Sequence, residues 1–482
     1  MHLLSLCRVL GALLIVLGGS QLVPMAVALV YREPEWVVFL YSAAAVAATG
    51  VLMYLVSRHA KEITERDGFY VVTAGWICSA LVGAIPYYFT GTLPAFTDAV
   101  FESMSGFTTT GASVFERYDT VSNGIFLWRS MTQWFGGMGI IVLALVILPA
   151  LGIGGMELFK REVPGPYSEK ITPRIRDTAK ALWSVYLLFT VLATLVLYGL
   201  GMTLFEAVNH ALTTISTAGF STNSGSVGGF ESPAIEWVII FFMFLSGMNF
   251  SHHYSFLTRK GRRWNFLRET EWRWYTTAMV VCALAVIAYL YLHQGYSLDQ
   301  AATKGSFQVV SILTTTGYSS DDYVQWGAFP QILLFILMIT GGCAGSTSGG
   351  VKFVRVLLIF KFIRLELLKL LHPKVVVHVK INRVRVTPEI QSNIFAFLFL
   401  YITTLAAATL LVSLDGHSFL TSVGAAVSAL SNIGPGLDAV GPAENFAGMS
   451  SYLKWVLIAC MMMGRLELMT VFVLFMPRAW LR

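Results

Sequence analysis

Charged residues are scarce in this sequence. Only 12% of its 482 residues are Asp, Glu, Lys or Arg, whereas 56% are hydrophobic, and the mean hydropathy is +0.67. This composition excludes an ordinary water-soluble globular protein. Many apolar runs approach the ~20 residues that a helix needs to cross a ~30 Å hydrocarbon core. We therefore expect a polytopic protein that spans the lipid bilayer.

Cysteine is also rare, and its spacing shows no pattern. The five cysteines lie in or beside apolar runs without zinc-ligand or disulfide spacing, which indicates packing residues. HExxH, GxSxG and Walker A motifs are missing from the sequence, so we expect no enzyme activity and no organic cofactor. The net charge of +6 does not indicate nucleic-acid binding, because the basic residues are confined to particular loops.

One short polar motif occurs four times against this apolar background. Each copy has a glycine with hydroxyl residues three and six positions before it, and the glycines are Gly111, Gly219, Gly317 and Gly434. The copies recur at intervals of roughly a hundred residues, which indicates a structural repeat. The hydroxyls six positions before the glycines fit either a pore-facing role or bonding back to helix carbonyls; they are Ser105, Thr213, Ser311 and Ser428.

We interpret the four motifs as re-entrant loops that form a cation filter. Non-helical backbone is tolerated at bilayer depth only where it lines a cavity or is buried in protein. Glycine lets successive carbonyls point the same way, and a ring of carbonyl oxygens can replace the hydration shell of a cation. The predicted ion-binding residues are Thr109, Thr110, Gly111, Thr217, Ala218, Gly219, Thr315, Thr316, Gly317, Asn432, Ile433 and Gly434.

The apolar runs around these loops predict an all-α membrane fold with one pore. Four pseudo-symmetric span–pore-helix–span repeats surround it, at residues 68–156, 157–258, 259–371 and 372–482, and residues 1–67 add an N-terminal two-helix hairpin. Runs of 10–14 apolar residues are too short to span and indicate pore helices: Pro94–Phe107, Leu204–Ile215, Ala301–Leu313 and Phe419–Leu430. The returning spans are Phe126–Leu151, Ile235–Leu257, Pro330–Arg355 and Tyr452–Pro477.

The distribution of charge predicts the orientation. Lys and Arg gather between the repeats, whereas Asp and Glu gather after the filter loops. The positive-inside rule then puts the repeat junctions and both termini in the cytoplasm, with acidic filter mouths outside. In the third junction, Val375–Ile381 and Val384–Val386 alternate in polarity around a turn, which predicts a small cytoplasmic β-hairpin.

A glycine-rich break interrupts the third returning span and is a candidate gate. Its residues include Gly341, Gly342, Gly345, Ser346, Thr347, Ser348, Gly349 and Gly350. Such a break survives in a membrane only if it faces a pore, so we predict a movable constriction below the third filter loop; a packing kink is the alternative. Lys352, just past the break, fits either a gating role or snorkelling to the interface.

Several charged and polar residues in the apolar segments fit more than one role. Arg465 lies mid-helix, where an arginine costs ~2.5–3.5 kcal/mol unless it finds a partner or water. Glu102 and Arg129 fit either an ion pair or interface positions. Asn249, His252 and His253 fit interfacial polar residues better than ligands; no role follows for them from the sequence.

Four stretches together resemble the Trk/Ktr/HKT superfamily of cation transporters, and within it the bacterial TrkH family. They are Gln133–Gly139, Gly341–Gly350, Asn432–Gly436 and Met463–Glu467, and the resemblance extends over essentially the whole chain. It implies potassium selectivity, because relatives with glycine in all four loops generally prefer potassium, and serine in the first loop marks sodium-preferring plant relatives. Thr316 and Tyr318 depart from the alanine and phenylalanine expected there.

The resemblance also implies a mechanism and partners. It implies potassium ion uptake across the bacterial inner (plasma) membrane through a gated, channel-like pore, driven by the membrane potential with or without a coupled ion. K+ would bind at the filter residues, and Arg465 would hold the gate loop. The implied partners are a second copy, as a homodimer, and a cytosolic nucleotide-binding, TrkA-like regulatory ring. Sodium or mixed sodium/potassium transport remains the alternative.

Overall fold

The computed structural model describes residues 3–59, 65–147, 171–258, 265–374, 377–382 and 384–476. Within these ranges the regular secondary structure is helical apart from one two-stranded β-hairpin. Six of the described helices are long and apolar enough to cross a membrane, or up to eight if each of two bent helix pairs forms one span. The expected all-α polytopic membrane fold is confirmed.

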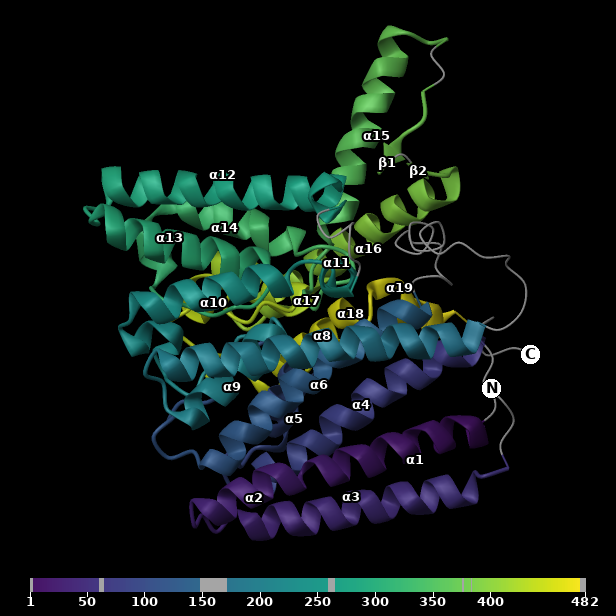
Figure 1. Cartoon of the computed structure of the whole chain (residues 1–482), viewed down its shortest axis with the longest axis vertical. Coiled ribbons are helices and arrows are strands. Elements are labelled where there is room, and N and C mark those ends of the chain that lie inside the picture. Colours follow the sequence, from purple (N-terminus) through teal and green to yellow (C-terminus); the bar gives the residue numbers. More distant parts are fainter. Residues whose placement is uncertain are drawn as a thin grey trace.

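The N-terminal helices form a hairpin along one edge of the molecule (Figure 1). Helices α1 (Leu3–Ser20) and α2 (Leu22–Val30) pack against α3 (Trp36–Val56). A Cβ added at Gly50 would lie 2.7 Å from the carbonyl oxygen of Gly11. Glycine therefore permits this contact, as small residues do between other membrane helices.

Glu33 attaches this hairpin to the rest of the fold. It lies in the turn between α2 and α3, and its carboxylate accepts hydrogen bonds from the backbone N–H groups of Asn123 (2.7 Å) and Gly124 (3.0 Å). These residues begin α6 (Asn123–Ile147), whose first N–H groups have no partner within the helix. A negative side chain at this end also offsets the helix dipole.

Four long helices are each followed by a short one. The long helices are α4 (Glu65–Phe89), α8 (Ile171–Gly199), α12 (Thr270–His293) and α16 (Pro388–Ser413). The short helices are α5 (Phe96–Phe107), α9 (Leu204–Ile215), α13 (Leu298–Leu313) and α17 (Phe419–Ser431). Thr203 and Ser297 begin α9 and α13 with capping boxes. These bounds lie close to the expected pore helices, and the division into four repeats stays a prediction.

The returning segments are broken more often than the sequence indicated. They are α6, then α10 (Pro233–Ser246) with α11 (Phe250–Thr258), α14 (Ala328–Thr340) with α15 (Phe353–Leu371), and α18 (Ser451–Arg465) with α19 (Leu468–Phe472). The expected break between α14 and α15 is present. The continuous spans expected at Ile235–Leu257 and Tyr452–Pro477 are wrong, because α10 and α11 bend by 94° and α18 and α19 by 111°.

Contacts from the loop between α14 and α15 explain the break between α10 and α11. The backbone N–H of Cys343 donates to the Gly247 carbonyl (2.9 Å), and the N–H of Phe250 donates to the Gly345 carbonyl (3.1 Å). The groups that leave the helical ladder are thus satisfied by another part of the protein, which makes a broken helix tolerable inside a membrane.

A side-chain ion pair marks the break between α18 and α19. Glu467 has a φ of +56° at the start of α19. Its carboxylate pairs with the Arg355 guanidinium of α15 at 2.6 Å. Both breaks therefore depend on partners distant in sequence.

The predicted hairpin is formed by β1 (Lys380–Ile381) and β2 (Val384–Arg385), which pair antiparallel. Val375, Val376 and Arg383, which also belong to the predicted hairpin, lie outside the described residues. Helix α15 projects from the helical bundle, and the hairpin lies beside its base, next to α16 (Figure 1). The Asn382 side-chain oxygen accepts a hydrogen bond from the Thr270 N–H at the start of α12 (2.8 Å).

The short 3-10 helices are η1 (Ser226–Phe230), η2 (Asn265–Arg268), η3 (Tyr323–Trp326), η4 (Asp438–Val440) and η5 (Val473–Phe475).

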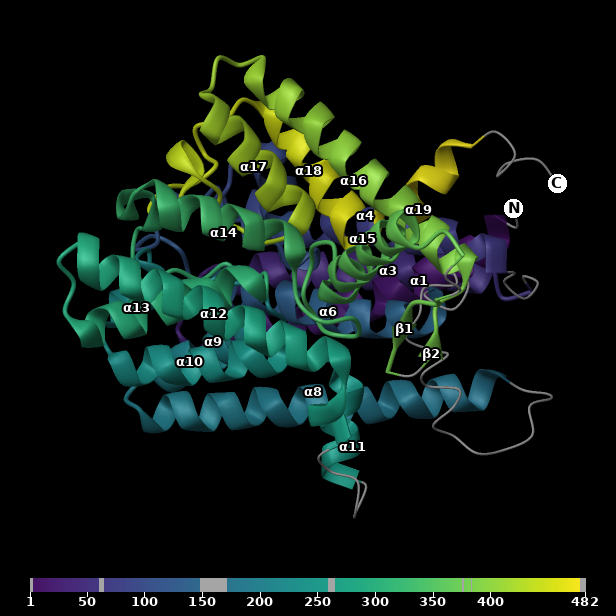
Figure 2. The same cartoon turned by 90° about the horizontal axis from the view of Figure 1, so that it is seen from above.

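Ion pairs join a returning helix to the next short helix. Seen from above, α16, α17 and α18 form one side of the bundle, and α8, α9 and α10 lie toward the other (Figure 2). Lys454 of α18 pairs with Asp98 of α5 at 2.7 Å, and Lys304 of α13 pairs with Glu236 of α10 at 2.7 Å. An ion pair thus joins α18 to α5, and another joins α10 to α13, in addition to the packing between these helices.

We expect Asp98→Ala to destabilise the fold by about 1.5–3 kcal/mol, the range for a hydrogen bond to a charged group. The Lys454 ammonium, only 6% exposed, would lose its carboxylate partner. Thermal unfolding in detergent measures the change. Glu366→Ala is the control, because its pair with Lys369 is largely exposed and such pairs contribute little. Equal melting temperatures for Asp98→Ala and the native chain would contradict this expectation.

Candidate ion-binding site and gate

The four short helices α5, α9, α13 and α17 end in the same backbone motif. In each, the N–H of the residue before the filter glycine donates to the carbonyl five residues earlier. The donors are Thr110, Ala218, Thr316 and Ile433, and the acceptors are Ser105, Thr213, Ser311 and Ser428, at 2.8–3.0 Å. This is a Schellman motif, which satisfies free carbonyls at a helix C-terminus.

The residue two positions before each glycine adopts the left-handed backbone conformation, with a positive φ. The φ values are +53° at Thr109, +52° at Thr217, +57° at Thr315 and +56° at Asn432. A non-glycine residue in this region costs about 1–3 kcal/mol, and such strain concentrates at functional sites. Its occurrence at the same position of all four loops therefore indicates a requirement for this backbone path.

The four filter glycines form a closed ring. A Cβ added at Gly111 would lie closer than 3.0 Å to the carbonyl oxygen of Ala218, in the second loop. The same holds for Gly219 against Thr316, Gly317 against Ile433, and Gly434 against Thr110. Each glycine thus faces the next loop in chain order, and the fourth faces the first.

Two separate constraints require glycine at these positions. The φ values of Gly111, Gly219, Gly317 and Gly434 lie between +79° and +109°, a region that residues with a Cβ rarely adopt. The neighbouring carbonyl also occupies the space of a side chain. A side chain here would strain its own loop and displace the adjacent one.

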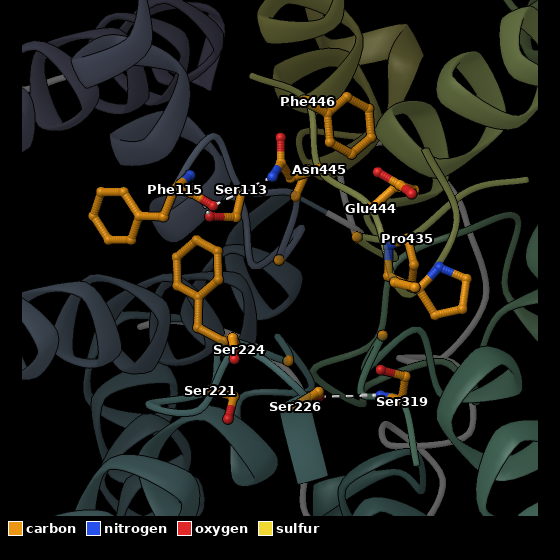
Figure 3. Close-up of a pocket in the computed structure, with 18 of the residues that line it drawn as sticks. Ser113, Phe115, Ser221, Ser224, Ser226, Ser319, Pro435, Glu444, Asn445 and Phe446 are labelled. Atoms are coloured by element: carbon orange, nitrogen blue, oxygen red, sulfur yellow. Dashed lines mark hydrogen bonds between the residues drawn. The ribbon is translucent and has the colours of Figure 1, made fainter. Parts of the chain in front are cut away.

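One side of the glycine ring opens into a pocket of about 180 Å³ (Figure 3). All four glycines line it, together with Ser113, Ser221, Ser319, Glu116 and Glu444. Carboxylates at such a mouth raise the local concentration of cations. Of the described residues, no group of three or more His, Cys, Asp or Glu residues is placed to hold a metal ion.

The hydroxyls six positions before the glycines do not share one role. Ser311 donates to the carbonyl of Tyr318 (2.6 Å) and Ser428 to that of Gly434 (2.5 Å), so both hold loop carbonyls. Thr213 instead bonds back to the helix carbonyl of Asn209 (3.0 Å). The Ser105 hydroxyl is buried without a hydrogen-bond partner. Of the two alternatives from the sequence, bonding back to a helix carbonyl is found at Thr213, whereas Ser311 and Ser428 bond to loop carbonyls, which neither alternative anticipated.

Glu102 and Arg129 form a buried ion pair behind the first loop. The distance between Arg129 Nε and Glu102 Oε1 is 2.6 Å, and the two side chains are 2% and 0% exposed. Glu102 also accepts hydrogen bonds from the Ser113 hydroxyl (3.2 Å) and the Val114 N–H (3.0 Å). Arg129 donates to the carbonyl of Ser221 in the second loop (3.0 Å). The pair thus holds the ends of two loops together.

Two amide side chains also bridge loops: Gln133, which was given no individual role from the sequence, and Asn432, which was predicted to bind the ion. Gln133 of α6 donates to the Ala218 carbonyl (2.8 Å) and accepts from the Phe220 N–H (3.2 Å). Asn432 of the fourth loop donates to the Thr110 hydroxyl of the first (3.0 Å). Gln133 lies in the stretch that resembles the transporter family, but its bonding partner is visible only in the fold.

The loop at residues 341–350 lies against the other side of the ring. The Gly349 N–H donates to the hydroxyl of Thr315 (2.6 Å), and the Thr217 hydroxyl donates to that of Thr347 (3.1 Å). A Cβ at Gly349 would overlap the Ser431 carbonyl. The glycine-rich loop therefore contacts the second, third and fourth filter loops. Within this loop, φ is positive at Gly341, Gly345 and Gly350. A Cβ added at Gly342 would meet the side chain of Ser348.

Arg465 holds this loop from α18. Its side chain is 2% exposed and donates to the carbonyls of Thr347 (2.8 Å) and Gly136 (3.0 Å). The nearby carboxylate of Glu467 pairs with Arg355 instead. Arg465 thus brings a positive charge to the helix–loop contact without a described ion-pair partner.

Two further side chains hold the same loop. The Lys352 ammonium donates to the Ser348 carbonyl, so it turns back onto the loop. Glu271, at the start of α12, accepts the Ala344 N–H (2.7 Å) and was not singled out from the sequence. Glu271 follows Thr270, the residue bonded to the β-hairpin turn.

The remaining polar candidates make structural contacts. His252 pairs with Glu269 at 3.0 Å, and His253 Nε2 lies 2.9 Å from the Leu245 carbonyl oxygen. The Asn249 side-chain oxygen accepts the N–H of Ser251 (2.9 Å) in the break between α10 and α11. The interpretation of these three side chains as interfacial polar residues stays a prediction.

Comparisons with known proteins agree with one another. A family model for TrkH, described as a cation transport protein, matches residues 35–481. Trk system potassium uptake protein TrkH of Salmonella typhimurium is 40% identical over 490 residues, and that of Escherichia coli 39% over 488, with 100% of each chain covered. The crystal structure of the potassium transporter TrkH from Vibrio parahaemolyticus matches with a TM-score of 0.92 at 35% identity over 100% of both chains.

We expect Glu102→Ala to destabilise the protein by about 3–5 kcal/mol, because a buried charge would lose its partner. Arg129 would keep its guanidinium in a site that is 2% exposed. The melting temperature in detergent measures the loss. Glu116→Ala, an exposed change at the rim of the same pocket, is the control and should be nearly neutral. A melting temperature for Glu102→Ala equal to that of the control would show that the pair contributes little.

Proposed function

Because the chain belongs to the TrkH family of cation transport proteins, we propose that it takes up potassium ions across the bacterial inner membrane. The ions pass through a gated pore lined by main-chain carbonyl oxygens. The observation that carries this proposal is the ring of four glycines, each against a carbonyl of the next loop. The relatives named Trk system potassium uptake protein supply the identity of the ion.

The helix ends favour a cation at the ring. The C-termini of α5, α9, α13 and α17 all lead into the filter loops. Each helix end carries roughly half a negative charge from its aligned peptide dipoles. Four such ends and the carbonyl oxygens attract a bare cation and replace its water. K+ is the transported ion here, and no organic cofactor takes part.

The membrane potential supplies the driving force. One elementary charge gains ~2.3 kcal/mol by moving across 100 mV, which is enough for substantial accumulation without a chemical step. Uptake with or without a coupled ion is compatible with this energy. The acidic mouth faces outside and the termini face the cytoplasm, as the positive-inside rule predicts.

The loop at residues 341–350 closes the pore below the filter. Its contacts with Thr217 and Thr315 support this role, because they lie on the side of the ring away from the pocket. Arg465 stabilises the closed position by two hydrogen bonds, and its charge repels cations. Release of these bonds would open the path.

The assembly follows the family resemblance. We propose a homodimer with one pore in each protomer and a cytosolic nucleotide-binding ring as regulator. The projecting helix α15 and the β-hairpin offer a surface for such a regulator. The hairpin reaches the gate through Asn382, the start of α12 and Glu271.

Gly111→Ser should lower the ratio of rubidium to sodium flux in proteoliposomes by about tenfold, or ~1.4 kcal/mol. A side chain at φ +82° would strain the loop and push against the Ala218 carbonyl. The control is Gly416→Ser, which has a φ of +81° but no neighbouring atom within 4 Å. Growth of a bacterium deficient in potassium uptake gives an independent readout. If native proteoliposomes favour sodium over rubidium, the chain is instead a sodium transporter.

Arg465→Ala should raise basal rubidium flux several-fold when no regulatory partner is present. The substitution removes both the hydrogen bonds to the gate loop and the positive charge below the filter. Arg364→Ala, an exposed change on α15, is the control and should leave flux unchanged. Basal flux equal to that of the native chain would remove Arg465 from the gate.

A further inference from the structure

Neighbouring filter loops are joined by a different side-chain contact at each junction. Arg129 bridges the first and second loops, and Asn432 bridges the fourth and first. The hydroxyl of Tyr323 donates to the Gly436 carbonyl (2.6 Å) and bridges the third and fourth. At the junction between the second and third loops, the Ser319 N–H donates to the Ser226 hydroxyl (3.2 Å), and Tyr318, the residue directly after Gly317, makes a further side-chain contact.

The Tyr318 hydroxyl is held by the preceding unit. The side chain is 0% exposed, and its hydroxyl forms a hydrogen bond with the Thr213 hydroxyl of α9. It also lies 3.3 Å from the carbonyl oxygen of His210, one helical turn earlier. A residue adjacent to the third filter glycine is thereby anchored to the short helix that leads into the second loop.

His210 connects the same helix to the end of the second loop. Its Nε2 atom lies 3.0 Å from the Ser221 hydroxyl oxygen, and its Nδ1 atom lies 2.9 Å from the Glu206 carbonyl oxygen. The Nδ1–H therefore donates to the carbonyl, and Nε2 accepts from the serine. The imidazole ring also stacks on Tyr318, with ring centroids 5.9 Å apart at 25°. One helix thus sets the positions of both loop ends.

The backbone of Tyr318 is fixed from the opposite direction. Its carbonyl accepts a hydrogen bond from the Ser311 hydroxyl of α13 (2.6 Å). Tyr318 therefore links α9, through its hydroxyl, to α13, through its carbonyl. Gly317 lies directly beside this link, so its position depends on both helices.

No other described filter loop has this anchor. The residues that directly follow the other glycines are Ala112, Phe220 and Pro435, and none has a hydroxyl. Phe220 instead packs its ring against Arg129, with 3.5 Å from the guanidinium carbon to the ring centroid. The Tyr318 hydroxyl is also the atom by which this chain departs from the phenylalanine expected there.

We propose that the Tyr318 hydroxyl is a positioning group that sets the spacing of the second and third filter loops and so increases discrimination between cations. The inference rests on the proposed function, in which the ring is the filter. Carbonyl spacing and carbonyl orientation both depend on where these loops are held, and each contributes to the choice between potassium and sodium. Without the hydroxyl, the backbone beside Gly317 loses its attachment to α9 but keeps its attachment to α13, and the four loops still form a ring.

The test is Tyr318→Phe, assayed for rubidium and sodium flux in proteoliposomes. We expect the rubidium-to-sodium ratio to fall by about fivefold, with total flux and melting temperature nearly unchanged; this corresponds to ~1 kcal/mol. Tyr275→Phe is the matched control, because its hydroxyl is also buried but has no hydrogen-bond partner. An unchanged ratio in folded Tyr318→Phe overturns the proposal, as does an equal fall in the control.

A second set of variants separates positioning from general loosening. Thr213→Val removes the other half of the hydrogen bond and should lower the ratio similarly, whereas Thr213→Ser keeps a hydroxyl and should restore it. The double variant Tyr318→Phe with Thr213→Val should be no worse than either single change. Additive losses overturn the proposal.

The Gly111→Ser assay distinguishes failure of this inference from failure of the proposed function. If Gly111→Ser lowers the ratio while Tyr318→Phe does not, the filter stands and the tyrosine anchor fails. If native chain and Gly111→Ser show the same ratio, the filter itself fails.

Discussion

Backbone polar groups inside a bilayer must find partners within the protein, and the ring of four glycine loops that we propose as the filter depends on this constraint. Four helices end within the fold, and each end leaves carbonyls without helical partners. The repeated Schellman motif satisfies them, and it does so by turning Thr109, Thr217, Thr315 and Asn432 left-handed. The chain that leaves each turn then brings its glycine against the next loop. The same bonds that make the helix ends tolerable also direct the backbone into a ring.

The four loops of the ring have similar backbone conformations, but different side chains join each loop to its neighbour. The four loops share hydrogen bonds and φ values, whereas the contacts between them use an ion pair at Arg129, a phenol at Tyr318 and an amide at Asn432. A single chain can vary each junction separately, which identical subunits around a pore cannot do. The loop at residues 341–350, which we propose as the gate, continues this arrangement on the other side, because it bonds to Thr217 and Thr315 of the ring loops and also to α12 and α18.

The breaks between α10 and α11 and between α18 and α19 show where sequence reasoning reached its limit. The break at residues 341–350 was predictable because five glycines stand in one short apolar segment. Residues 247–249 and residues 464–467 contain one glycine each, so neither segment has a local signal comparable to five glycines. Their bends depend on Gly345 and Arg355, which are distant in sequence. The roles of Gln133 and Glu271 were missed for the same reason.

The sequence by itself determined the membrane class, the four polar glycine motifs, the short helices before them and the glycine-rich break. Each of these depends on local composition or on a short motif repeated along the chain. Only the tertiary structure decided that Gly111 lies against Ala218, that Glu102 pairs with Arg129, and that Tyr318 reaches α9. These contacts join residues from different units, and one sequence without its fold does not specify which of many polar side chains meet. Hydropathy fixes which segments enter the membrane; packing and hydrogen bonding fix their neighbours.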